Sequence, residues 1–369
     1  MKVFFAKRNA AALLLAFSVL LFSSCQDVVL ANIRKEVELE EGKIPGDIRS
    51  IVRFKDKYFL ANGGILYKNN DAHYYGAWLY TTSPSGHVIK LAADSNYIYA
   101  LVGVSAENQK EGTNVGVSRY LYYSSDGANW SLVSGIGSGG TLAYNTVYIV
   151  YTYLFCTNSI DPANRKAYFI LNDGYYGQEK KAYELNGANA TELELGTENA
   201  STKPISQEYA VSRSCVYYNG TTYFFATNGA TTNETKDKAA TMYYYGSGPY
   251  LYWGGAAKSE TPFLCDDTIE SLGITSDYIL IGTDSGLKHI TLSNGVPGVA
   301  AEFLTNASST LSKAYSVLSI LVANPELTET QTPIYASQVY TGNGSSNSAQ
   351  FDHVGLWAYY PARGNWNRD

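Results

Sequence analysis

The chain has 369 residues, of which 45% are hydrophobic and 16% are charged. This composition supports a large buried core and excludes an intrinsically disordered protein. Tyrosine and glycine each occur 33 times. Because tyrosine favours strands and glycine favours tight turns, the combination predicts an all-β fold built from many short strands.

The formal net charge is −6. Lys2, Lys7 and Arg8 lie in the first 24 residues, which contain no acidic residue, so residues 25–369 hold 24 basic against 33 acidic side chains, a charge of −9. Nucleic-acid binding requires a cationic surface. The acidic balance therefore argues against a nucleic-acid partner.

The N-terminus combines a basic segment with the apolar run Ala10–Phe22, which is too short for a comfortable membrane span and predicts a secretory signal. The run leads into Leu21-Phe-Ser-Ser-Cys25, which resembles a bacterial lipobox. Phe22 departs from the tight Leu-Ala-Gly-Cys form and is similar to the looser lipoboxes of spirochaetes and some other bacteria. The resemblance implies a signal peptide over residues 1–24 and a lipid on Cys25. The alternative is an ordinary signal peptide or an uncleaved anchor in which Cys25 is incidental.

The predicted lipid implies an exported chain that is held at a membrane of the bacterial cell envelope, on its periplasmic or surface side. Residues 25–46 contain the alternating charged run Ile33–Glu41, followed by Gly42 and Pro45. This segment is predicted to be either a tether or an outer strand added to the last part of the fold. No later stretch is long and apolar enough to span a membrane.

A Tyr-rich strand pattern recurs through residues 47–369. Each copy has an apolar strand, a Tyr-rich second strand and a third strand near a glycine turn. The second strands are marked by Tyr58, Tyr97, Tyr153, Tyr223, Tyr278 and Tyr335. Their intervals of 39, 56, 70, 55 and 57 residues each accommodate one four-stranded sheet. The pattern predicts one β-propeller of about six four-stranded blades, with an array of β-sandwiches as the alternative.

The stretch Tyr120–Trp130 is the clearest strand-and-turn copy. Its residues Ser124-Ser-Asp-Gly-Ala-Asn-Trp130 resemble a shortened Asp-box, the Ser-x-Asp-x-Gly-x-x-Trp turn of sialidase-like and BNR-type propellers. The resemblance implies that Ser124, Asp126, Gly127 and Trp130 form a blade turn, and it bears on fold more than on activity. Asp126 is predicted to cap its own turn by accepting backbone N–H bonds.

Four connections between predicted strands are long and rich in Asn, Thr, Ser and Gly: residues 103–118, 159–166, 229–241 and 339–354. We interpret each as the link between the second and third strands of a blade. Such links open on the face that also carries the links between blades, so this face is the candidate binding surface. Its representative residues are Asn108, Asn114, Asn164, Asn233 and Asn343. The alternative is that these loops are surface insertions without a binding role.

No catalytic residue is assigned. A sialidase-like enzyme is expected to carry an Arg-Ile-Pro signature, whereas Lys43-Ile-Pro45 lacks the arginine, and no pair of carboxylates can be chosen. The histidines are scattered singly, and Asp266-Asp267 has no calcium-binding loop around it, so neither a metal nor a cofactor is predicted. Cys156, Cys215 and Cys265 are predicted to pack as small hydrophobic residues, with one disulfide as the alternative.

Together these patterns predict a membrane-anchored lipoprotein whose propeller is a non-catalytic binding or scaffold module for a protein or a glycan. Tyrosine pairs such as Tyr122-Tyr123 offer rings for stacking on sugars, although neighbours on a strand face opposite sides of the sheet. The alternatives are a glycoside-acting enzyme of the sialidase-like class and a purely structural envelope component.

Overall fold

The computed structural model describes residues 44, 47–69, 77–105, 117–134, 136, 141–142, 151–159, 161–172, 181–195, 210–218, 221–228, 240–245, 250–253, 269–293, 296–297, 301–302, 311, 315–323, 334–340, 354–360 and 365–368. The predicted signal peptide, Cys25 and nearly all of the segment 25–46 lie outside the described residues. Ile44 is buried in a core cluster with Ile48 and Ile51, so the described core begins slightly before the predicted boundary at residue 47.

The described strands form antiparallel meanders in which each strand pairs with its neighbour in the chain. The first meander comprises β1 (Ser50–Phe54), β2 (Lys57–Ala61), β3 (Ile65–Asn69) and β4 (Leu79–Tyr80). The second comprises β5 (His87–Ala93), β6 (Ile98–Ser105), β7 (Val117–Ser124) and β8 (Ser131–Leu132), with β9 (Thr141–Leu142) also paired to β7. The third comprises β10 (Tyr151–Asn158), the 3-10 helix η1 (Pro162–Asn164), β11 (Ala167–Asn172), β12 (Lys181–Asn186) and β13 (Asn189–Leu195).

The second half of the chain repeats the same plan. The fourth meander comprises β14 (Ala210–Tyr218), β15 (Thr221–Asn228), β16 (Ala240–Tyr245) and β17 (Tyr250–Trp253). The fifth comprises β18 (Ile269–Ile274), β19 (Tyr278–Thr283), β20 (Gly286–Ser293) and β21 (Val296–Pro297), with β22 (Ala301–Glu302) also paired to β20. The sixth comprises β23 (Ser316–Val322), β24 (Ile334–Val339), β25 (Gly355–Tyr360) and β26 (Asn365–Arg368).

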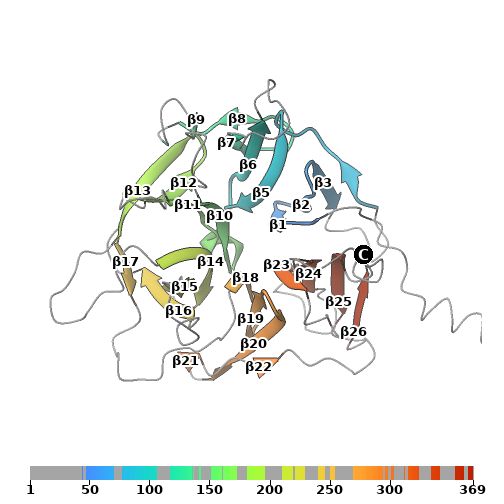
Figure 1. Cartoon of the computed structure of the whole chain (residues 1–369), viewed down its shortest axis with the longest axis vertical. Coiled ribbons are helices and arrows are strands. Elements are labelled where there is room, and N and C mark those ends of the chain that lie inside the picture. Colours follow the sequence, from blue (N-terminus) through green and yellow to red (C-terminus); the bar gives the residue numbers. More distant parts are fainter. Residues whose placement is uncertain are drawn as a thin grey trace, which may run out of the picture. The chain divides into compact units, whose positions relative to one another are not determined.

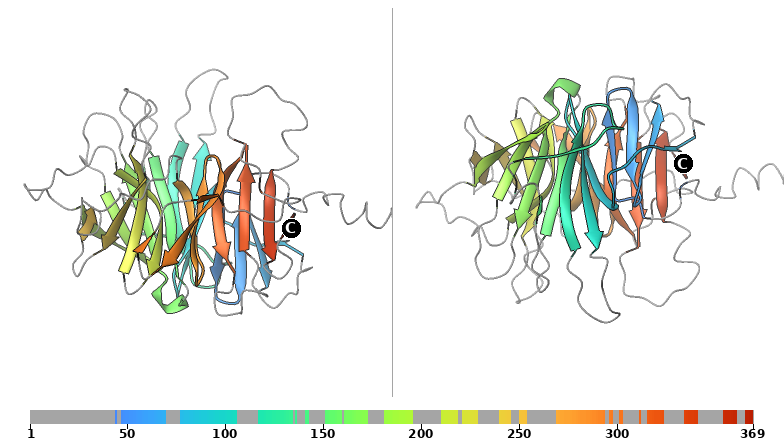
Figure 2. Two further views of the ribbon diagram at one scale, coloured as in Figure 1. Left: turned by 90° about the horizontal axis from the view of Figure 1, so that it is seen from below. Right: turned by 90° about the horizontal axis from the view of Figure 1, so that it is seen from above.

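The first strands of the six meanders form an inner ring. Each of β1, β5, β10, β14, β18 and β23 contacts the first strand of the next meander, and β23 contacts β1. The later strands of each meander extend outward from this ring (Figure 1), and the side views show the strands running between two faces (Figure 2). The prediction of an all-β propeller is therefore confirmed.

Burial falls from the axis to the periphery. The inner strands β18 and β23 are almost entirely buried, whereas both residues of the outer strands β4 and β8 are exposed. The core lies between neighbouring sheets: one cluster joins β1–β3 to β5 and β6, and another joins β1–β3 to β23–β25. The near-continuous apolar runs of the first strands follow from this burial on both faces.

Hydrogen bonding divides the strands into five sheets, compared with the prediction of about six blades. The difference arises between the third and fourth meanders, because β10 pairs with β14 and β13 pairs with β17, both in parallel. These pairings join two four-stranded meanders into one closed eight-stranded sheet. The remaining four sheets each contain one meander.

The strand assignment in the third repeat differs from the prediction. Tyr153 was expected in a second strand, but it lies in β10, which is the first strand of its meander and belongs to the inner ring. The second strand is β11, which carries Tyr168. Residues 159–166 therefore join a first strand to a second strand. They leave the sheet at the end opposite to the links between second and third strands, because the strands are antiparallel.

Candidate functional site: the axial channel and the Ser124–Trp130 turn

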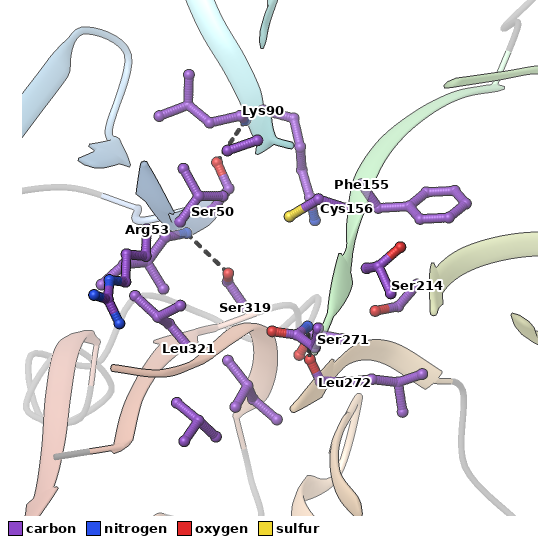
Figure 3. Close-up of a pocket in the computed structure, with 18 of the residues that line it drawn as sticks. Ser50, Arg53, Lys90, Phe155, Cys156, Ser214, Ser271, Leu272, Ser319 and Leu321 are labelled. Atoms are coloured by element: carbon purple, nitrogen blue, oxygen red, sulfur yellow. Dashed lines mark hydrogen bonds between the residues drawn. The ribbon is translucent and has the colours of Figure 1, made fainter. Parts of the chain in front are cut away.

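A small axial channel lies inside the inner ring. All six first strands contribute lining residues, and its cavity volume is about 50 Å³. A cavity needs at least about 10–15 Å³ measured in this way to hold one water, so the channel has room for a few waters or one small group. Figure 3 shows Ser50, Ser214, Ser271 and Ser319 around the opening, together with Lys90 and Cys156.

Serine hydroxyls in this channel join neighbouring first strands. The Oγ of Ser50 accepts the N–H of Leu91 at 2.7 Å, and the Oγ of Ser319 accepts the N–H of Ile51 at 2.9 Å. The Oγ of Ser271 donates to the carbonyl of Val317 at 3.0 Å. We call these three contacts the serine joints. Each links β1, β18 or β23 to the next first strand in the ring, where a buried main-chain group needs a partner.

Irregular register places several of these residues in the channel. The pairing of first and second strands shifts between Val88 and Lys90, and also between Val317 and Ser319. Similar shifts precede Ser214 in β14 and Ser271 in β18. A β-bulge bends a strand and re-aims the side chain beside it, and this explains why four first strands present a polar residue at the cavity.

Positive charge gathers at the channel. Arg53, Lys90 and Arg165 all line the cavity, and Glu270 is the only acidic residue among the described residues that line it. The Nη1 of Arg53 donates to the carbonyl of Ala323 at 3.2 Å, and its buried Nε has no hydrogen-bond partner in the described structure. The Nζ of Lys90 donates to the carbonyl of Leu318 at 3.4 Å.

Burial shifts the pKa values of charged and titratable side chains around Arg53. Burial, together with the positive charge of Arg53, lowers the pKa of Arg165. Burial raises the pKa of Tyr58 to about 12, although Arg53 and Arg165 act in the opposite direction. The Tyr58 hydroxyl donates to the carbonyl of Ala323 at 3.4 Å, the same oxygen that accepts from Arg53. The two arginines and Tyr58 therefore form one electrostatically coupled cluster.

The cysteines of the described structure are reduced. Cys215 is fully buried, and its Sγ lies 3.7 Å from the Oγ1 of Thr157, while Cys156 packs between two core clusters. Burial raises the pKa of both thiols. Both are free, so the predicted packing as small hydrophobic residues holds for this pair. Cys265 lies outside the described residues.

The Ser124–Trp130 turn is held by its own side chains. The Oδ1 of Asp126 accepts the N–H groups of Asn129 and Ala128, each at 2.8 Å, and the Oγ of Ser124 accepts the N–H of Gly127 at 2.9 Å. These bonds hold the pKa of Asp126 well below its usual range, with the N–H groups of Asn129 and Ala128 as the largest causes. Asp126 thus has the capping role expected from the sequence.

The same turn docks on the first meander. Trp130 donates its Nε1–H to the carbonyl of Thr82 at 3.0 Å, and the Nζ of Lys55 donates to the carbonyl of Ser125 at 2.6 Å. Gly127 has φ +77° and lies directly against the ring of Phe59. The turn therefore fastens the second sheet to the first, and its side chains are used in structural contacts.

Among the predicted loop residues, Asn164 is described. It ends η1, and its Nδ2 donates to the Oδ2 of Asp161 at 3.0 Å, which closes a local turn. Figure 2 shows η1 at one end of the sheets. Asn164 thus belongs to a link between first and second strands, which corrects its placement on the loop-bearing face. The other four, Asn108, Asn114, Asn233 and Asn343, lie outside the described residues.

Sequence reasoning missed Arg53, Lys90 and Arg165 as a group. They come from β1, β5 and the β10–β11 connection, and no motif links them. Within the described ranges no cluster of three His, Cys, Asp or Glu residues is suited to hold a metal ion. The same residues include no helix long and apolar enough to cross a membrane.

Meanders arranged around a channel lined by their first strands define this protein as a β-propeller. No protein-family model and no curated protein matches the chain. Among solved structures, a glucose dehydrogenase is 10% identical, with TM-score 0.41, over 82% of this chain and 95% of that one. A nidogen/laminin complex is 9% identical, with TM-score 0.40, over 70% and 81%. A xylan beta-1,4-xylosidase from Bacillus halodurans C-125 is 12% identical, with TM-score 0.35, over 88% and 70%.

Proposed function

We propose that this protein is a lipid-anchored component of the bacterial cell envelope whose propeller is a non-catalytic binding or scaffold module for a protein or a glycan. The observation that carries this proposal is the closure of the axial channel. The serine joints link β18, β23, β1 and β5 in turn around a cavity of about 50 Å³. Pockets that enclose a small-molecule ligand usually measure about 300–1,000 Å³. A ligand of that size, or a larger partner, would therefore bind on a face of the ring and not inside the channel.

The links between second and third strands support one face as the binding surface. In the first and fifth meanders these links are tight, since β3 begins four residues after β2 ends and β20 begins three residues after β19 ends. Residues 106–116, 229–239 and 340–354 form the corresponding links in the second, fourth and sixth meanders. They are long, and they are rich in residues that form adaptable hydrogen bonds.

The binding role is tested with the chain from residue 26 onward. A glycan array and a pull-down from envelope extracts are expected to give a signal that falls when residues 106–116 are replaced by a short glycine turn. The matched control shortens residues 160–164 at the opposite end of the sheets, and this change should leave the signal intact. Equal loss in both variants, or no partner in either assay, contradicts the proposal. Sugar release from a fluorogenic panel favours the glycoside-acting enzyme instead.

The anchor is tested separately. Cys25→Ala is expected to abolish palmitate labelling and to release the protein from the membrane fraction, because acyl chains contribute about 0.8 kcal/mol per buried CH₂. Cys265→Ala is the control and should label normally. Persistent labelling of the Cys25→Ala variant would remove the lipoprotein assignment and leave the propeller's binding role standing.

A further inference from the structure

Two arginine side chains line the axial channel without a carboxylate partner. Arg53 is partly buried; its Nη1 donates to the carbonyl of Ala323, while its Nε is buried and unpaired within the described structure. Arg165 is also partly buried, and its guanidinium makes no hydrogen bond or ion pair with any described residue. The Nε of Arg53 is a buried donor of a cation, and such a group is unfavourable without a hydrogen-bond acceptor, which an anion would supply.

The acidic groups nearby are committed elsewhere or outnumbered. The Oδ1 of Asp161 accepts the N–H of Ala163, and its Oδ2 accepts from Asn164. Its attraction is the weakest influence on the pKa of Arg165. Glu270 also lines the cavity and already interacts with another group. Its single negative charge faces three positive charges among the described lining residues. The channel therefore keeps an excess of positive charge in a chain whose residues 25–369 carry a charge of −9.

We propose that the end of the axial channel bounded by Arg53 and Arg165 binds a single oxyanion group: a phosphate, a sulfate or a carboxylate. A guanidinium presents parallel N–H donors that match such groups in a bidentate arrangement. The cavity of about 50 Å³ has room for one such group. Lys90 adds a third positive charge to the lining of the same cavity.

This oxyanion site is independent of the proposed binding face. Arg53 is the penultimate residue of β1 and Arg165 lies in the β10–β11 connection, so both lie where a first strand leads into a second strand. Because β10 and β14 pair in parallel, their last residues lie at a common end of the sheet, whereas β15 ends beside the start of β14, at the opposite end. A failure of the oxyanion site leaves the proposed partner face untouched.

Anion binding is measured on the full-length chain in detergent by thermal denaturation and titration calorimetry. Sodium phosphate, sulfate and acetate are compared with chloride at constant ionic strength. A ligand of the native state raises the melting temperature by mass action, so at least one oxyanion is expected to do so while chloride does not. The ranking of the three identifies the group. No increase with any of them overturns the proposal.

Arg165→Gln is the decisive variant, because its side chain has no described hydrogen bond to lose. Affinity for the preferred anion should fall at least tenfold. In chloride alone this variant should be as stable as the wild type or more stable, since the repulsion from Arg53 is removed. Lys166→Gln is the matched control: Lys166 is exposed, pairs with Glu184 at 2.9 Å, and should leave anion binding unchanged. Unchanged affinity in Arg165→Gln, or an equal loss in Lys166→Gln, contradicts the site.

Discussion

Gly127 offers the sharpest test of how the Ser124–Trp130 turn fastens two sheets together. The residue has φ +77°, and a Cβ built on it lies 2.6 Å from Cζ and 2.9 Å from Cε1 of Phe59. Phe59 is 2% exposed, and its ring is held between those of Phe54 and Tyr67, each with a centroid 6.2 Å away. The ring therefore has little room to retreat from a new methyl group.

The expected loss in Gly127→Ala has two parts. A left-handed backbone conformation costs a residue with a Cβ about 1–2 kcal/mol. Forcing a methyl group into a packed core costs about 1–3 kcal/mol more. The free energy of unfolding should therefore fall by about 2–5 kcal/mol, which is a large fraction of the stability of a typical domain.

Urea denaturation followed by tryptophan fluorescence measures this loss. Phe59→Leu should relieve the clash, so the double variant should be more stable than the sum of the single changes by about 0.5–3 kcal/mol. Gly64→Ala is the control, because the nearest side-chain atom to its added Cβ belongs to Tyr80 at 3.6 Å and its φ lies outside the left-handed region. Wild-type stability of Gly127→Ala, or strict additivity with Phe59→Leu, would refute this account of the turn.

Three further predictions concern the turn, the joints and the arginine cluster. Asp126→Ala should reduce the amount of stability that the protein loses in acid. Because the pKa of Asp126 is lowered in the folded state, its stabilisation is present above about pH 4 and disappears as the pH falls through the pKa of the folded state. The free energy of unfolding at pH 7 and at pH 2 measures this difference. Ser319→Ala removes the acceptor of the buried Ile51 N–H and should cost about 1–3 kcal/mol in urea denaturation, whereas Ser85→Ala at an exposed site should be neutral. Since the pKa of Tyr58 is raised to about 12, its stabilisation is complete below about pH 10 and is lost as the pH rises to 12; Tyr58→Phe should remove this alkaline loss, and an unchanged pH dependence would contradict it.

The propeller was predictable because its signal is local and repeated. Strand-favouring aromatics next to glycine turns recur along the chain, and five of the six marked tyrosines lie in or immediately before second strands. In the third repeat the sequence misleads, because Val147–Val150 is as apolar as a first strand and the pattern therefore places Tyr153 in the second strand. Only the contacts of β10 with β5 and β14, which are distant in sequence, identify it as a first strand.

The candidate site was much less predictable than the fold. The Ser124–Trp130 turn is a continuous stretch, and the capping role of Asp126 follows from side-chain chemistry within three residues. The channel cluster has no such continuity, since Arg53 and Arg165 are brought together only when the ring closes. A partly buried arginine without a carboxylate is recognisable only after burial and hydrogen bonding are known.

The serine joints also bear on how far the repeats can diverge. Each joint needs one hydroxyl on one strand, and its partner is a main-chain group that every residue supplies apart from the missing N–H of proline. A mutation in the partner strand therefore leaves the joint intact as long as the backbone keeps its path. At these three junctions the first strands can stay joined while the side chains of the partner strand change, so the joints tolerate sequence divergence between neighbouring repeats.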